Sequence, residues 1–351
     1  MAIFVHIVDF LVIIFRFILN SVLSDSNTNL YPTKMKHLLL LFSLTLAFYS
    51  CNNTAEKQPS TPVTEDDEIT YEAIGKLGDT LYAAEPSEEI MEKYLEKQRI
   101  YEEEPDDLDN LIWYGRFTAY LGNYRDAIEI YTKGLDKFPE ESRLLRHRGH
   151  RYISVREFDK AIADLSKAAE LIKDRENKTE PDGMPNAKNI PLSTMHGNIY
   201  YHLGLAHYLK NNMQAALDAY KMCLETSSSP DNVVSATHWI YMINRRMGRV
   251  DTAEKYLATI DKDMEVIEND AYHNACLMYK GELKPEDLYD PNSEDSASGS
   301  ALKYAVGNWH YYNGDRELAK EIFREIVSGD DWASFGYIAA EADLARMQPA
   351  K

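Results

Sequence analysis

The chain has 351 residues, of which 44% are hydrophobic, and it carries a formal net charge of −19. This length and apolar content are enough to bury a sizeable core, so the composition excludes an intrinsically disordered chain. The excess of acidic over basic residues, 57 against 38, argues against a general nucleic-acid-binding surface because it repels polyanions. The three cysteines, Cys51, Cys223 and Cys276, are too few and too widely spaced for a disulfide framework or a zinc knuckle.

The N-terminal region contains two apolar stretches. The second, MKHLLLLFSLTLAFYSC from Met35 to Cys51, has a short cationic start, an apolar run too short to span a bilayer, and a small residue before the cysteine. It resembles a bacterial lipoprotein signal, from whose usual Leu-Ala box Phe48 and Tyr49 depart. The resemblance implies cleavage, lipidation of Cys51, and export to a bacterial membrane, with the outer membrane facing the periplasm as the expected location.

The remaining N-terminal segments follow from this signal. Residues 1–34 are apolar but include Asp9 and Arg16, each of which costs about 2.5 to 3.5 kcal/mol at the centre of a membrane helix. We therefore expect residues 1–34 to be an over-extended start, with an extra hydrophobic segment as the alternative. Residues 35–50 are then the signal peptide. Residues 51–68 are polar and aperiodic, which predicts a flexible tether.

A 34-residue repeat follows the tether. Its five registers begin at Leu108, Ser142, Gly197, Val234 and Ser300. All five have Ala at position 20 and a bulky apolar residue at position 24, and four of the five have Gly at position 8. This pattern resembles the tetratricopeptide repeat. The resemblance implies an all-α fold, a right-handed α-solenoid of helical hairpins over residues 108–348, preceded by N-terminal capping helices in residues 69–107.

Three further features of the repeats lead to expectations. Position 15, between the two helices, is Gly or Asn in four registers and Arg156 in the second, where a left-handed backbone conformation is expected. A weaker repeat fits Gly281 at the same position but has Glu286 at position 20. The last helical segment, from Trp332, is expected to cap the far end of the stack.

The first helix of each hairpin is expected to line a concave groove through positions 2, 5, 9 and 12. The polar residues at these positions are mostly Arg, His and Tyr, with Asp109 as the carboxylate among them. The guanidinium groups of arginine and the hydroxyls of tyrosine bind carboxylates well. These residues therefore predict an acidic or carboxylate-bearing protein or peptide partner. The alternative is that the arginines are merely solvated and the tyrosines pack between helices. The candidate groove residues are Arg116, Arg143, Arg146, His150, Tyr201, Tyr208, His238, Arg245, Tyr304, Asn308 and Tyr311.

Residues 176–196 interrupt the register with a segment rich in Pro, Gly and Asn. Loops longer than about 12 to 15 residues are uncommon in compact domains unless they are functional or disordered. This insert could fold over the groove beside Arg146 and Tyr201, or it could be a surface excursion. The histidine pairs lack a carboxylate pattern for a metal, and no catalytic or cofactor motif occurs, so we expect no metal, no cofactor and no catalytic residues.

These features lead to one main hypothesis and two alternatives. The main hypothesis is a lipid-anchored, non-enzymatic scaffold that binds a peptide segment or protein partner in its groove, does not bind nucleic acid, and is compatible with homo-oligomer formation. The first alternative is an enzyme with an unrecognised site under the 176–196 insert, which a convergent acid, base and nucleophile there would favour. The second is a structural envelope assembly factor that uses the convex face.

Overall fold

The computed structural model describes residues 71–227, 229–289 and 297–348. The chain divides into two compact units, Met1–Glu68 and Ile69–Lys351, and all described residues belong to the second. The predicted over-extended start, signal peptide, lipidated Cys51 and tether therefore lie outside the described residues. No helix in the described ranges is both long enough and apolar enough to cross a bilayer.

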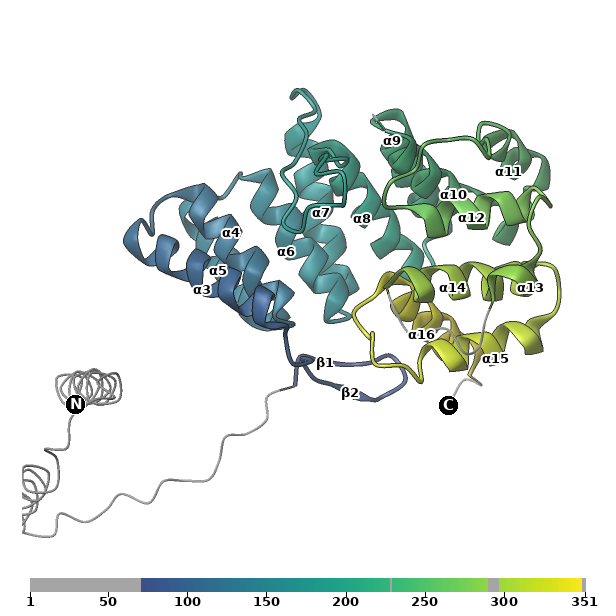
Figure 1. The fold of residues 1–351 in the computed structure, drawn as a ribbon, viewed down its shortest axis with the longest axis horizontal. Helices are drawn as coiled ribbons and strands as arrows, with labels where there is room; N and C mark the ends of the chain where they lie inside the picture. The colour runs from purple at the N-terminus through teal and green to yellow at the C-terminus, as the bar shows by residue number, and fades with distance from the viewer. Residues whose placement is uncertain (1–70, 228, 290–296, 349–351) are drawn as a thin grey trace, which may run out of the picture. The chain divides into compact units, whose positions relative to one another are not determined.

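The described part of the chain consists almost entirely of α-helices that pack as successive antiparallel hairpins (Figure 1). A two-stranded antiparallel hairpin, β1 (Ala73–Ile74) with β2 (Thr80–Leu81), comes first. It is followed by α3 (Glu88–Glu103), α4 (Leu108–Tyr120), α5 (Tyr124–Lys137), α6 (Ser142–Ser154), α7 (Phe158–Ile172), α8 (Met195–Leu209), α9 (Met213–Glu225), α10 (Pro230–Arg246), α11 (Val250–Leu257), α12 (Asp270–Tyr279), α13 (Pro285–Leu288), α14 (Ala297–Tyr312), α15 (Arg316–Ile326) and α16 (Phe335–Met347). The predicted all-α solenoid of helical hairpins is confirmed.

The position-8 glycines are the points of closest approach within the hairpins. The pairs are Gly115 with Tyr131, Gly149 with Leu165, Gly204 with Tyr220 and Gly307 with Phe323, and a Cβ on each glycine would come within 2.5–2.7 Å of that partner side chain. The position-20 alanines of all five hairpins are fully buried. Positions 8, 20 and 24 thus mark where two helices touch, which is why the sequence pattern located them correctly.

The position-15 residues all have a left-handed backbone, with φ between 63° at Asn211 and 101° at Gly314. Arg156 adopts φ 64°, a conformation that is costly for a residue with a Cβ. Its guanidinium is held in place: Nε lies 2.9 Å from Glu341 Oε2, and Nη2 donates to the carbonyl of Trp332 at 2.8 Å. Arg156 therefore serves both as the turn residue of the second hairpin and as an attachment point for the C-terminal region.

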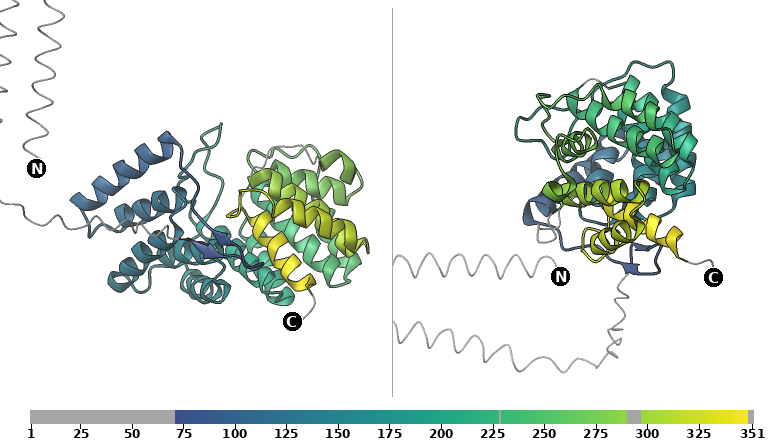
Figure 2. Two further views of the ribbon diagram at one scale, coloured as in Figure 1. Left: turned by 90° about the horizontal axis from the view of Figure 1, so that it is seen from below. Right: turned by 90° about the vertical axis from the view of Figure 1, so that its right-hand side faces the viewer.

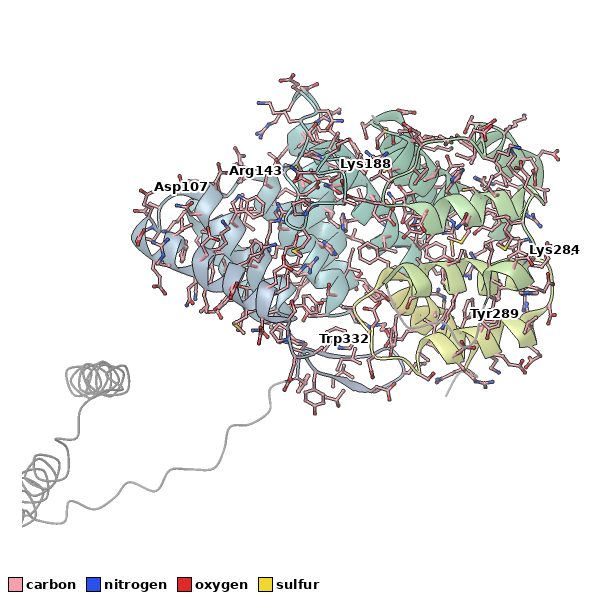
Figure 3. The ribbon with its side chains drawn as sticks, in the orientation of Figure 1. Asp107, Arg143, Lys188, Lys284, Tyr289 and Trp332 are labelled. Carbon is pink, nitrogen blue, oxygen red and sulfur yellow. The ribbon has the colours of Figure 1, made fainter. Side chains whose placement is uncertain are left out.

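The C-terminal helix α16 does more than cap the stack. It packs along α14 and α15 and also reaches back to α8, and its Glu341 forms the buried pair with Arg156. Immediately before α16, Trp332 Nε1 donates to the carbonyl of Tyr82 in the segment after β2 (labelled Trp332 in Figure 3). The two ends of the described region are therefore joined, which the position of α16 in the sequence did not indicate.

The prediction of capping helices throughout residues 69–107 is wrong for the segment before α3. That segment holds the β1–β2 hairpin, whose turn includes Gly78 at φ 102°. Ala73 and Leu81 from its inner face are buried and pack with Val155. Strands of two residues are too short to give a recognisable alternating pattern, so the sequence offered no clear signal for them.

Gly149→Ala should lower the free energy of unfolding by about 1 to 3 kcal/mol, because the new methyl group would overlap Leu165. Combining it with Leu165→Ala should cost less than the sum of the two single changes, since the shortened side chain makes room for the methyl. Urea denaturation of the three variants measures both effects. Strictly additive costs would contradict the assigned contact.

Candidate binding groove

The connection between α7 and α8 is a long non-helical loop, which Figure 2 shows from two further directions. Its ends are joined by an antiparallel bridge between Thr179 and Thr194. The amide of Glu180 donates to the carbonyl of Ser193 at 2.9 Å, next to this bridge. We call residues 176–194 the strap. The last two residues of the predicted insert, 195 and 196, belong to α8 instead.

The strap lies against the groove-facing side chains of α4, α6 and α8. Glu180 is buried, and its Oε2 lies 3.2 Å from Arg146 Nη2 and also accepts a hydrogen bond from Asn198 Nδ2. Arg116 Nη1 donates to the carbonyl of Pro181 at 2.9 Å. The sequence left open whether the insert folds over the groove or is a surface excursion, and in the structure it lies over the groove.

The far part of the strap reaches the fourth hairpin. Asn232 Nδ2, at the start of α10, donates to the carbonyl of Leu192 at 2.8 Å. Asn186 Nδ2 donates to Glu268 Oε1 at 2.6 Å, just before α12. Lys188, labelled in Figure 3, marks this outer part, which is mostly exposed. The strap thus spans the groove and is tied to it mainly by polar contacts.

A cleft of 740 Å³ remains open between α4, α6 and the base of the strap. Its apolar lining is formed by Ile112, Trp113, Ile172, Pro181 and Met195, and its charged lining by Arg116, Arg143, Arg175 and Lys178 opposite Asp109, Glu141, Glu176 and Glu180. The guanidinium of Arg116 lies over the ring of Trp113, 4.3 Å from its centroid. The cleft therefore joins an apolar floor with charges of both signs.

Arg143, at the start of α6, shows how the cleft charges pair (labelled in Figure 3). Its Nη1 lies 2.5 Å from Asp109 Oδ1 and its Nε 3.2 Å from Glu141 Oε1. Asp109, the groove carboxylate noted in the sequence, is therefore already bound to a neighbouring hairpin. In contrast, no described residue forms an ion pair with the exposed side chains of Arg175 and Lys178.

Three neutral histidines lie behind the cleft. Burial lowers the pKa of His147 and His150 well below the ordinary value and that of His202 to about 3, and the charge of Arg146 lowers all three further. Arg146 Nη1 lies 2.7 Å from His147 Nδ1, which suits a neutral ring nitrogen acting as acceptor. No group of His, Cys, Asp and Glu in the described part of the chain is placed to hold a metal ion.

The cationic stretch of α6 separates by face. Arg146 points to the strap, whereas Arg148 binds both carboxylate oxygens of Asp164 on α7 at 2.7 and 2.8 Å. Arg151 Nη2 lies 2.6 Å from His150 Nδ1, and its guanidinium lies over Tyr124. The predicted groove positions of Arg146 and His150 are thus distinct from that of Arg148, but Arg151 contacts His150 directly.

The helix α16 occupies the concave side of the later hairpins. Both oxygens of its Asp343 accept from Arg246 of α10, at 2.8 and 2.5 Å, and Tyr304 of α14 donates to the same carboxylate at 2.8 Å. Burial alone would raise the pKa of Asp343, but Arg246 and Arg346 hold it below its ordinary value. Phe335, at the start of α16, packs on the ring of His150. This chain therefore places its own carboxylate where an acidic ligand was predicted.

Four predicted groove residues are consequently buried in the core and offer no surface to a ligand in this structure. They are Tyr208, His238, Tyr304 and Asn308, each at most 1% exposed. The hydroxyls of Tyr208 and Tyr304 lie 2.5 Å apart, and Asn308 Oδ1 accepts from Arg246 Nε at 2.7 Å. Two helices cause this burial. Asp343 of α16 accepts from Tyr304 and binds Arg246, which in turn donates to Asn308. His238 instead packs against Tyr272 and Tyr279 of α12. Glu341 and Asp343 in an otherwise apolar helical sequence were the signal that could have revealed the position of α16.

The other predicted residues of this half are half-buried and already have partners. Tyr201 accepts from Trp239 Nε1 at 3.0 Å and borders a smaller cavity of 280 Å³ under the strap. Arg245 donates to the hydroxyl of Tyr241 and to Asn313 Oδ1, both at 2.7 Å. The ring of Tyr311 lies 4.5 Å from the guanidinium of Arg246. Among the described residues, the larger cleft of the first two hairpins thus brings Arg116 and Arg143 to one open site, whereas Tyr201 borders the smaller cavity.

Histidine burial predicts that acid destabilises the fold. Because the pKa values of His147, His150 and His202 are lowered in the folded chain, the unfolded chain binds more protons below about pH 6.5. The free energy of unfolding should fall between about pH 7 and pH 5, by up to about 1.4 kcal/mol per pH unit for each histidine. Urea denaturation across this range should give a shallower slope for His202→Gln than for wild type. Equal slopes would contradict the neutral, buried state of His202.

One segment of the chain matches a protein-family model. Residues 197–230, which include α9 and all but the first two residues of α8, match the tetratricopeptide repeat, and no curated protein matches the chain. Among solved structures, the chain is similar to YrrB, described as a TPR protein with an unusual peptide-binding site, at 16% identity over 66% of this chain and 91% of that chain, with a TM-score of 0.38. It is also similar to a tetratricopeptide repeat protein from Parabacteroides merdae ATCC 43184, at 17% identity over 72% of this chain and 92% of that chain, with a TM-score of 0.44. The chain has a tetratricopeptide-type helical repeat fold.

Proposed function

We propose that this chain is a membrane-tethered scaffold that binds a peptide segment of a protein partner in the cleft between α4, α6 and the strap. The observation that carries the proposal is the open 740 Å³ cleft, in which an apolar floor meets cations of both hairpins and of the strap. Its volume lies in the range of about 300 to 1,000 Å³ that ligand pockets have, and its lining combines apolar surface with charged side chains. Over the later hairpins α16 and α12 cover much of the predicted groove, and the remaining cavity there is smaller, so this cleft offers a partner the most surface.

The side chains of the cleft suit a peptide with an apolar anchor. Trp113 lies beneath Arg116, and Ile112 and Met195 add apolar surface beside it. A buried aromatic or aliphatic anchor in such a pocket supplies much of the affinity of a peptide interface. The exposed cations Arg175 and Lys178 at the rim then favour a segment that is acidic next to its anchor.

The enzyme alternative gains no specific support beneath the strap. Cys223 and His202 both border the 280 Å³ cavity there. Burial raises the pKa of the Cys223 thiol to about 12 and lowers that of His202 to about 3. A protonated thiol beside a weakly basic imidazole is poorly suited to nucleophilic catalysis at neutral pH. A binding function therefore remains the better supported of the two.

Site-specific photo-crosslinking tests the cleft. A crosslinking residue at Arg175, on the rim, should capture a partner that the same residue at Lys255, exposed on α11, does not. Trp113→Ala should reduce capture at Arg175 by about tenfold, because interface anchors carry most of the binding energy. Equal capture from both positions, or capture unaffected by Trp113→Ala, would contradict binding in this cleft.

The membrane attachment rests on the Met35–Cys51 signal pattern. Cys51→Ser should move the protein from the membrane fraction to the soluble fraction, because stable attachment needs more than one acyl chain and all of them would be lost. Fractionation and mass spectrometry of the mature N-terminus measure this, with Ser60→Ala in the tether as the control. A wild-type chain intact from Met1 and without acyl chains would refute the lipid anchor.

A further inference from the structure

We infer that the partner segment is acidic and extended, and that the strap occupies its place in the groove until the partner displaces it. This inference rests on the proposed function and names the chemistry of the ligand. Its starting point is the strap sequence Glu180–Pro181–Asp182–Gly183, which runs along the groove-facing side chains of three hairpins. The strap therefore shows what kind of chain the groove accepts.

Neighbouring residues of the strap bind side chains on neighbouring helices of the groove. The carboxylate of Glu180 pairs with Arg146 and accepts a hydrogen bond from Asn198. The backbone carbonyl of Pro181 accepts a hydrogen bond from Arg116. Asp182, two residues after Glu180, carries the next carboxylate of the strap. Partial burial raises its pKa, and the charge of Arg116 lowers it. An extended backbone with acidic side chains two residues apart is thus the matching ligand.

Gly183 shapes the strap where it crosses α4. A Cβ at this position would overlap the hydroxyl of Tyr120, so an alanine here would require the Tyr120 side chain or the strap to shift. The contact depends on sterics alone and involves no charge. It provides a second way to loosen the strap, independent of the Glu180 ion pair.

The groove has more positive charge than the strap neutralises. Arg146 uses Nη1 and Nη2, while its Nε is buried without a hydrogen-bond partner among the described residues. Arg116 is bound to a neutral carbonyl and, at 3.4 Å, to the hydroxyl of Tyr120. A carboxylate that engages Arg146 in the bidentate, fork-to-fork manner would form stronger charge-assisted bonds than the strap does.

The strap is also built to be displaced. Its outer residues are mostly exposed, with Met184 at 44% and Ile190 at 47%, and Leu192 is the apolar side chain that it buries. Segments with few buried apolar contacts open at a low free-energy cost compared with the packed helices around them. An acidic segment could therefore exchange with the strap without unfolding the hairpins.

The test measures binding of a labelled synthetic peptide with the sequence of residues 177–185, NKTEPDGMP, to the full-length protein by fluorescence anisotropy. Glu180→Gln and Gly183→Ala should each bind the peptide about tenfold more tightly than wild type, because freeing the groove raises the fraction of competent molecules. Asp174→Asn, at an exposed acidic residue just before the strap that does not line the cleft, should leave the affinity unchanged. Adding Arg146→Met to Gly183→Ala should remove the gain.

A second peptide, with Gln and Asn in place of its Glu and Asp, tests whether binding depends on the two carboxylates or only on the shape of the peptide. The inference predicts that this carboxylate-free peptide binds none of the variants. It is overturned if the two peptides bind equally, or if neither Glu180→Gln nor Gly183→Ala binds more tightly than wild type. Thermal melting of each variant identifies those that remain folded, and Gly183→Ala keeps all the groove arginines.

Crosslinking from Arg175 in the Glu180→Gln protein separates this inference from the proposed function. If partner capture persists but the acidic peptide does not bind, the inference fails and the cleft function stands. If both partner capture and peptide binding are lost, the proposed function fails as well. Increased capture together with tighter peptide binding supports both.

Discussion

Two buried arginine–carboxylate pairs determine where the C-terminal helix lies, and the available groove depends on that position. Arg246 of the fourth hairpin binds Asp343, and Arg156 of the second hairpin binds Glu341, with all four side chains at most 6% exposed. Such pairs give little net stability compared with apolar packing, but removing one partner typically costs about 3 to 5 kcal/mol. They therefore specify one docking position for α16 and disfavour every other.

The position of α16 divides the groove into two parts with different roles. Over the later hairpins, arginine and tyrosine side chains that could have met an acidic partner bind the chain's own Asp343. Over the first hairpins, the strap provides Glu180 in a similar way but exposes most of its length. The helix α16 is part of the core, whereas the strap lies on the surface and is held by polar contacts.

The same chemistry thus explains the fold and the candidate ligand. An acidic protein with arginines in its groove satisfies them internally, because an unpaired buried charge is costly. Only Arg175, Lys178 and Arg116 at the open cleft lack an ion pair with a described residue, and Arg116 is bound to a neutral carbonyl. In the binding mode proposed above, a partner would bind these residues and would compete with Glu180 for Arg146.

The sequence by itself determined the repeats, because the features that define them are local. Gly149 and Leu165 face each other within one hairpin, and the left-handed residue at position 15 belongs to its own turn. It also predicted Arg116, Arg143 and Arg146 as groove residues, and the structure places them at the cleft or beneath the strap. Which of the groove positions stay open was decided only by the tertiary structure, since Asp343 and Glu180 reach Arg246 and Arg146 across 97 and 34 residues of sequence. Helical periodicity reports which face a side chain takes, but it carries no information about a distant segment that covers that face.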